Sequence, residues 1–304
     1  MAISVEKKIH FEGHKGAVYA LSHSEKDHVF YSGGSDGVVL LWDISNPQRA
    51  IVSAKTNSQI LSILHHKSTN RLFIATMSGG FHLVDLNEKK ELHYIIYEHE
   101  SIFNLQSFQN ESKVLAASKM GTLSVWNAED LRLLVEKTLS TESIRSIAVS
   151  PDKKFIAAGS SDSKIYILDI ALNVIQVLET HSSSVFSLTF SPDGKYLLSG
   201  SRDAQLGVWD VENGFALKQK IPAHLFTINQ IAYHPSESLF ATASRDKTIK
   251  LWSASDFKLL KVIDKERFGG HSHSVNNLLW MENGKYLISC GDDKAVIAWS
   301  ITYE

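Results

Sequence analysis

The segment from His181 to Asp210 reads HSSSVFSLTFSPDGKYLLSGSRDAQLGVWD, and its pattern recurs along the chain. Two runs of alternating apolar residues, SVFSLTF and KYLLSGS, flank the turn Ser191-Pro192-Asp193-Gly194, where proline presets one backbone angle and glycine tolerates a positive φ. A second turn at Arg202-Asp203 leads to AQLGVWD, and GFALKQKI follows as a fourth run. Short strands between tight turns predict a four-stranded antiparallel meander with SVFSLTF innermost.

The tryptophan of this segment marks the repeat. Its equivalents are Trp42, Val84, Trp126, Leu168, Trp209, Trp252 and Trp299, and subtracting successive positions gives steps of 42, 42, 42, 41, 43 and 47 residues. A period of about 40–45 residues that ends near a Trp-Asp pair is typical of β-propeller blades. Because one blade cannot bury its own faces, we expect the seven copies to stack into a single domain over residues 1–304.

Whole-chain composition limits the function classes. The chain has 304 residues, 43% of them hydrophobic and 21% charged, and a formal net charge of −2. These values are ordinary for a globular protein and argue against a general polyanion binder. No signal-peptide pattern and no apolar run of about 18 residues is present, which predicts a soluble cytoplasmic protein, nuclear residence not excluded, with no membrane partner. The single cysteine, Cys290, is expected to be buried and inert.

Four residue types recur together at fixed offsets before the tryptophan: aspartate at six, serine or threonine at ten, and histidine at twenty-eight. The four complete sets are His14, Ser32, Asp36 and Trp42; His181, Ser199, Asp203 and Trp209; His224, Thr242, Asp246 and Trp252; and His271, Ser289, Asp293 and Trp299. A buried indole N–H and a buried carboxylate both need hydrogen-bond partners, so the sets are predicted to be structural. The Ser/His/Asp content also fits a catalytic triad, but four equivalent nucleophiles in one chain argue against an enzyme.

These residues resemble the WD-repeat (tryptophan–aspartate repeat) β-propeller family, and the resemblance covers essentially the whole chain. It implies an all-β, seven-bladed propeller of four-stranded antiparallel blades. It also implies that each set is one hydrogen-bonded chain, running from the aspartate through the imidazole and hydroxyl to the indole; such a set is called a tetrad below. The second to fourth copies lack complete tetrads, with Val84, Ser78, Ile74 and Thr56; Trp126, Met120, Ala116 and His99; and Leu168, Asp162, Ala158 and Ser140 at the corresponding places. We expect these blades to rest on apolar packing.

The two ends of the chain complement one another. After Trp299 only SITYE remains, which is too short for an outer strand, whereas SVEKKIHF precedes the first copy without a place in it. Residues 4–11 are therefore predicted to supply the outer strand of the last blade. This arrangement closes the ring and removes an exposed sheet edge.

The resemblance implies that partners dock on the face that carries the loops leading into the inner strands, called the loop face below. Two positions per blade are expected to look outward there. The first series is Tyr19, Leu61, Phe103, Arg145, Phe186, Asn229 and Asn276. The second is Ser35, Met77, Lys119, Ser161, Arg202, Arg245 and Asp292. Aromatic residues edged by arginines match the composition of protein-binding hot spots, although each ring alone is also consistent with simple packing.

Two further features of the sequence are candidate sites. The longest step adds about five residues in IDKERFGGH, where an exposed Phe268 would extend the loop face, or the insertion is a harmless length variant. His65 and His66 are adjacent in a strand and would point to opposite sides, with no cysteine or acid cluster at ligand spacing. No metal and no cofactor is predicted.

The sequence therefore predicts a non-catalytic scaffold or adaptor that docks one or more partner proteins or peptides, as a monomeric subunit of a complex. The arginines suggest an acidic or phosphorylated peptide. An RNA- or chromatin-associated subunit is the alternative, but only Lys119, Arg145, Arg202 and Arg245 recommend nucleic-acid binding.

Overall fold

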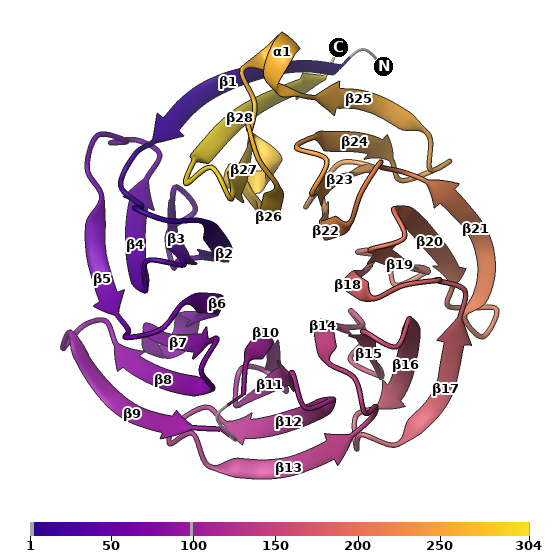
Figure 1. The fold of residues 1–304 in the computed structure, drawn as a ribbon, viewed down its shortest axis with the longest axis horizontal. Helices are drawn as coiled ribbons and strands as arrows, with labels where there is room; N and C mark the ends of the chain where they lie inside the picture. The colour runs from indigo at the N-terminus through magenta and orange to yellow at the C-terminus, as the bar shows by residue number, and fades with distance from the viewer. Residues whose placement is uncertain (1–2, 98–99, 304) are drawn as a thin grey trace.

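A computed structural model describes residues 3–97 and 100–303. It contains seven four-stranded antiparallel sheets arranged as blades around a central axis (Figure 1). The predicted all-β, seven-bladed propeller is therefore confirmed. Within the described ranges, no helix has the length and apolar character needed to cross a membrane.

In blades 1–6 the strands follow one another from the axis outward. Blades 1 and 2 comprise β2 (Val18–His23), β3 (Val29–Gly34), β4 (Val38–Asp43) and β5 (Ile51–Lys55), and β6 (Ile60–His66), β7 (Arg71–Thr76), β8 (Gly80–Asp85) and β9 (Lys90–Ile96). Blades 3 and 4 comprise β10 (Ile102–Phe108), β11 (Lys113–Ser118), β12 (Thr122–Asn127) and β13 (Leu133–Thr138), and β14 (Ile144–Val149), β15 (Phe155–Ser160), β16 (Lys164–Asp169) and β17 (Val174–Glu179). Blades 5 and 6 comprise β18 (Val185–Phe190), β19 (Tyr196–Ser201), β20 (Gln205–Asp210) and β21 (Ala216–Pro222), and β22 (Ile228–Tyr233), β23 (Leu239–Ser244), β24 (Ile249–Ser253) and β25 (Leu259–Ile263).

Blade 7 joins the two ends of the chain. It comprises β26 (Val275–Met281), β27 (Tyr286–Gly291), β28 (Val296–Tyr303) and, outermost, β1 (Ile3–Phe11). Strand β1 runs antiparallel to β28, from the pair Ile3 and Tyr303 to the pair Phe11 and Val296. The predicted closure is therefore confirmed. The remaining elements are the helix α1 (Lys265–Phe268) and two short 3₁₀ turns, Lys67–Thr69 and Glu282–Gly284.

The turn between β18 and β19 shows why the quoted segment folds as it does. Gly194 takes a φ of +74°, and its N–H donates to the Ser191 carbonyl at 2.9 Å. The Asp193 carboxylate accepts from the Lys195 N–H at 3.1 Å and from the Ser191 hydroxyl at 2.6 Å. A short acidic side chain thus satisfies the turn locally, and the chain reverses at the end of the blade opposite the loop face.

The apolar core lies between neighbouring blades. In one cluster Leu198, Leu206 and Val208 of blade 5 pack on Ile228 and Trp252 of blade 6. Another cluster joins Cys290 of blade 7 to blade 1, and burial raises the pKa of this thiol. Each blade therefore buries its face on the next one, as stacked repeats must.

Candidate functional site

The tetrad of blade 5 is a continuous hydrogen-bonded chain. The Asp203 carboxylate lies 3.1 Å from His181 Nδ1, His181 Nε2 lies 2.8 Å from Ser199 Oγ, and Trp209 Nε1 donates to the same hydroxyl at 2.9 Å. The same pattern occurs in blades 1, 6 and 7. The four hydroxyls, all with 0% exposure, belong to Ser32, Ser199, Thr242 and Ser289. Such hydroxyls face an indole and not a substrate cleft.

The tetrads also hold the loop face in place. Each aspartate accepts the backbone N–H of the residue after the tetrad histidine: Lys15 at 2.8 Å, Ser182 at 3.0 Å, Leu225 at 3.1 Å and Ser272 at 2.7 Å. Burial alone would raise the pKa of Asp203, but hydrogen bonds from His181 and Ser182 keep this pKa well below its ordinary value. The ionised carboxylates therefore fix the loops that lead into the inner strands.

Acid should weaken these anchors in a defined pH range. Although burial opposes it, hydrogen bonding to His271 and the charge of that ring hold the pKa of Asp293 at about 2, against an ordinary value of 3.8. A carboxyl with a lower pKa in the folded chain stabilises the fold above the unfolded-state pKa, and this contribution is lost as the pH falls towards the folded-state value. We expect the free energy of unfolding to drop steeply between about pH 4 and pH 2.

The matched variant is Asp293→Asn. It should be less stable than the wild type at neutral pH and should show a shallower decline over the acid range, measured by urea unfolding at a series of pH values. A variant with the same acid slope as the wild type would contradict this assignment.

Two of the blades without complete tetrads contain substitute polar networks. In blade 4, Ser140 stands where other blades have histidine, and its hydroxyl donates to Asp162 at 2.6 Å, beside Tyr166 OH at 2.7 Å. In blade 3, Trp126 Nε1 donates to Ser124 Oγ at 2.8 Å. The expectation of apolar packing alone is therefore incomplete, because neighbouring hydroxyls replace the missing partners. His99, assigned to the histidine place of blade 3, lies outside the described residues.

A β-bulge places the first series of loop-face residues. In every blade the pairing of the innermost strand with the second strand shifts register at one residue near the start of the inner strand. The skipped residues are Tyr19, Leu61, Phe103, Arg145, Phe186, Asn229 and Asn276. A bulge leaves its extra residue out of the ladder and re-aims its side chain, so these seven side chains occupy equivalent places around the axis.

Three members of this series form a stack. The Arg145 guanidinium carbon lies 4.6 Å from the centre of the Phe103 ring and 4.8 Å from that of the Phe186 ring. Its Nε donates to Ser161 Oγ at 2.7 Å. Burial and the charge of nearby Arg202 lower the pKa of Arg145. Arg202 therefore brings a second positive charge close to the stack. The cation of blade 4 is held between one ring from blade 3 and one from blade 5, an arrangement that stabilises it without a carboxylate.

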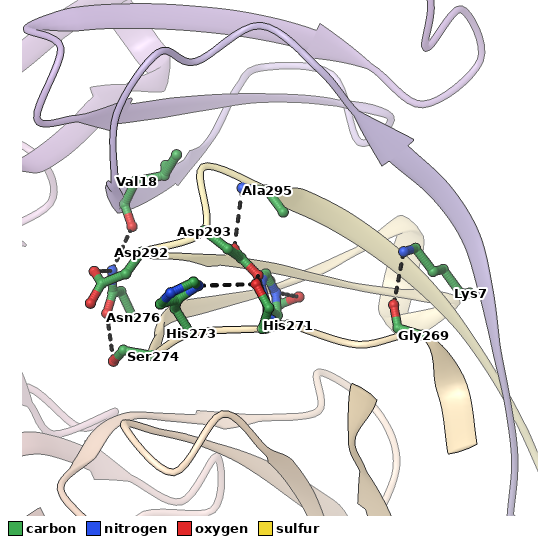
Figure 2. A network of polar contacts seen from close by, with 12 residues as sticks. Lys7, Val18, Gly269, His271, His273, Ser274, Asn276, Asp292, Asp293 and Ala295 are labelled. Atoms are coloured by element: carbon green, nitrogen blue, oxygen red, sulfur yellow. Dashed lines mark hydrogen bonds and ion pairs between the residues drawn. The ribbon is translucent and has the colours of Figure 1, made fainter. Parts of the chain in front are cut away.

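Two other members of the first series, Asn229 and Asn276, donate hydrogen bonds to the neighbouring blade. The Asn229 amide donates to Ser274 Oγ at 2.9 Å and to the Val275 carbonyl at 2.8 Å, which joins blade 6 to blade 7. Figure 2 shows Asn276 between Asp292 and Val18, to which its amide donates at 2.8 Å and 2.9 Å. These short amides reach the neighbouring backbone. The structure thus gives both amides a part in contacts between blades, and their contact with a partner stays a prediction.

The remaining members are half-buried around the axis. Burial and nearby Asp292 raise the pKa of Tyr19, so the phenol stays protonated at neutral pH and can donate a hydrogen bond. Leu61 on β6 is likewise half-buried. Both side chains therefore keep part of their surface exposed.

Some residues of the second series are bonded within the chain, and others are exposed to solvent. Lys119 pairs with Glu100 at 2.9 Å, and Ser161 accepts from Arg145. Arg202 and Arg245 are exposed. Met77 is 45% exposed, and Ser35 is half-buried. Positive charge therefore gathers over blades 4–6, while Asp292 marks the side of blade 7.

Phe268 does not lie with these residues. It ends α1, which begins after the N-cap Asp264 and stops at Gly269, and it packs partly buried against the core of blades 6 and 7. Figure 1 shows α1 at the outer rim beside β1, and Lys7 of β1 donates to the Gly269 carbonyl at 2.8 Å (Figure 2). The expected exposure of Phe268 is therefore wrong, because its ring is partly buried, and its contact with a partner stays a prediction. The inserted residues form the short helix α1, which packs where blades 6 and 7 meet.

Sequence reasoning missed the loop that leads into β22. Leu225 and Phe226 there are 82% and 58% exposed, the two highest values among the large apolar residues of the described ranges. The sequence signal was available, because the other complete tetrads follow their histidine with Lys15-Gly16, Ser182-Ser183 and Ser272-His273. An apolar pair directly after a tetrad histidine was the anomaly.

The two adjacent histidines have separate local partners. His65 Nε2 meets Asn70 Oδ1 at 3.0 Å, and His66 Nε2 donates to the Glu111 carbonyl at 2.6 Å. Across the described residues, no group of three or more histidine, cysteine, aspartate or glutamate side chains is arranged to hold a metal ion.

Comparison with known proteins agrees with this geometry. The family model described as WD domain, G-beta repeat matches residues 6–43, 135–169, 172–210, 215–253 and 263–300. These segments make up more than half of the chain, which therefore belongs to the WD-repeat family. The unmatched residues 44–134 include blade 2 and the first three strands of blade 3, and the tetrads of both blades are incomplete.

Individual relatives are longer than this chain. Nuclear distribution protein nudF of Emericella nidulans is 30% identical over 196 residues, which are 64% of this chain and 38% of the relative. Actin-interacting protein 1 of Caenorhabditis elegans is 24% identical over 302 residues, 96% of this chain and 48% of the relative. Protein HIR1 of Eremothecium gossypii is 28% identical over 216 residues, which are 64% of this chain and 22% of the relative. The chain thus spans less than half the length of each.

Proposed function

We propose that this chain is a non-catalytic adaptor, acting in the cytoplasm as a monomeric subunit of a complex, which docks a partner protein on its loop face. One observation carries the proposal: Arg145 stacks between Phe103 and Phe186 on three adjacent blades, with Arg202 beside it. Rings and arginines held rigidly at the centre of a face have the composition and preorganisation of a binding hot spot. An acidic or phosphorylated peptide has the complementary charge.

The non-catalytic part of the proposal has its own support. The Ser/His/Asp sets are buried, and their hydroxyls are bonded to both imidazole and indole. The relatives point the same way. One is named as an actin-interacting protein and another as a nuclear distribution protein, and neither printed name describes a reaction.

The RNA- or chromatin-associated alternative is less well supported. The net charge is −2, Lys119 is paired with Glu100, and Asp292 lies on the same face as the arginines. A protein that follows a phosphate backbone needs an extended positive surface, which this face has only over blades 4–6.

Partner capture by face-specific variants tests the proposal. Tagged wild type, Phe186→Ala, Arg202→Glu and Lys195→Glu would be purified from the native cell and the co-purifying proteins identified by mass spectrometry. Phe186→Ala and Arg202→Glu should each weaken capture of the main partner by about 1–3 kcal/mol with little change in melting temperature. Lys195→Glu, in the β18–β19 turn at the opposite end of the blade, should have no effect. A partner that is lost with Lys195→Glu and kept with the other two would show that the wrong face was chosen.

A further inference from the structure

The loop into β22 presents its apolar pair in a fixed conformation. The Leu225 N–H donates to Asp246 at 3.1 Å, and the Phe226 carbonyl accepts from Ser244 Oγ at 3.3 Å. The side chains nevertheless remain 82% and 58% exposed. Apolar surface held rigidly in water is unfavourable for the free chain and can be covered by a partner at low entropic cost.

Arginines stand on both sides of this pair. On one side the Ala204 carbonyl, two residues after Arg202, accepts from the N–H groups of Ala223 at 3.1 Å and His224 at 3.2 Å. On the other side the N–H of Arg245 donates to the Thr227 carbonyl at 3.0 Å. The arginines that form ion pairs within the described ranges are Arg71 and Arg267. The exposed guanidiniums of Arg202 and Arg245 therefore have no carboxylate there.

Arg145 extends the same surface towards the axis. Its Nε donates to Ser161 Oγ, the Ser161 carbonyl accepts from Ser184 Oγ at 3.3 Å, and the Ser184 carbonyl accepts from the Arg202 N–H at 2.9 Å. This chain of contacts joins blade 4 to blade 5 on the loop face. Like charges brought together without an acid create a place where an anionic group is favourable.

We propose that Arg145, Arg202, Leu225, Phe226 and Arg245, called the basic-apolar strip, bind an acidic amphipathic peptide segment. The inference rests on the proposed function and adds the chemistry of the partner. Apolar side chains of the segment cover Leu225 and Phe226, and its aspartates and glutamates pair with the guanidiniums. Arginine suits this role because its fork of N–H donors matches a carboxylate.

Carboxylates distributed along a segment fit the strip better than one phosphate. The three arginines come from three separate blades, and the turns that carry Arg202 and Arg245 bond through their backbones to the residues just before and just after the apolar pair. A nucleic acid fits less well, because successive bases stack on several open aromatic rings, and Phe226 is the one open ring of the strip. Here Phe103 and Phe186 are each stacked on Arg145.

Selection from a phage-displayed library of random peptides tests this without a known partner. The immobilised full chain should enrich peptides that combine aspartate or glutamate with leucine, phenylalanine or tryptophan. Arg202→Glu/Arg245→Glu and Leu225→Ser/Phe226→Ser should each weaken binding of the best peptide by about tenfold or more in fluorescence anisotropy. Added salt should weaken the wild-type complex, and Lys195→Glu should leave its affinity unchanged.

The outcomes separate this inference from the proposed docking face. If selected peptides need Leu225 and Phe226 but carry no excess of acidic residues, the inference is wrong and the docking face stands. If single-stranded RNA displaces the peptide at physiological salt, the strip is a nucleic-acid site and the inference is wrong. If Lys195→Glu abolishes binding while both double variants keep it, the inference and the docking face fall together. No enrichment over a chain carrying both double variants also overturns the inference.

Discussion

A chain that lacks residues 1–11 is expected to melt at a markedly lower temperature than the intact chain, or to aggregate. The deletion removes Val5 and Phe11, which are 8% and 1% exposed, and it uncovers the edge of β28. The Phe11 ring lies 5.3 Å from the rings of Phe30 and Trp42, so it ties the seventh blade to the first. Loss of one such buried ring alone costs about 3–5 kcal/mol.

Thermal melting and size-exclusion chromatography would measure this effect. The matched control is Glu6→Ala/Lys8→Ala, which changes two exposed side chains of β1 and keeps the strand in place. The control should melt close to the wild-type temperature, and Phe11→Ala should fall between the control and the deletion. A truncated chain that remains monomeric and melts with the wild type would show that β1 does not close the ring.

Asp203→Ala is expected to destabilise the fold by about 1–3 kcal/mol. The carboxylate accepts from His181 and from the backbone N–H groups of Ser182 and Gln205 at 3.0 Å each. Its removal leaves a buried imidazole and two loop N–H groups without their acceptor. The loop into β18 should also loosen, which would appear as faster amide exchange at Ser182.

The matched control comes from blade 2, where Ser78 occupies the place of the tetrad aspartate. Ser78 is exposed, and Ile74 and Val84 fill the places of the hydroxyl and the indole. Ser78→Ala should therefore cost less than about 1 kcal/mol in urea unfolding. Equal losses for the two variants would contradict the assignment of tetrads by offset.

Features that repeat along the chain could be predicted from sequence. The period near 42 residues reveals the blades. The spare segment before the first copy and the missing outer strand of the last copy together imply the pairing of β1 with β28. The first loop-face series was found by its constant distance from the tryptophan. The structure adds the reason for that constancy, since each of these residues occupies a β-bulge at the entry of an inner strand.

Contacts between blades could not be predicted from the sequence repeat. The stack of Arg145 on Phe103 and Phe186 depends on which side chains meet across three blades, and the amide of Asn276 is used up by a carbonyl of blade 1. Phe268 was predicted to be exposed because the sequence around it does not show that its ring packs against the core of blades 6 and 7. Leu225 and Phe226 do not occupy a position that repeats from blade to blade, so constant offsets do not reveal them.

Hydrogen–deuterium exchange of the chain with and without its captured partner tests the docking face most directly. The account predicts slower amide exchange on binding in the loops around residues 182–187, 201–205 and 224–228, which carry Phe186, Arg202 and the Leu225–Phe226 pair. Exchange in the turns at 150–154 and 191–195, at the other end of the blades, should not change. Protection confined to those turns or to the outer strands, with the inner-strand loops unaffected, would contradict the account.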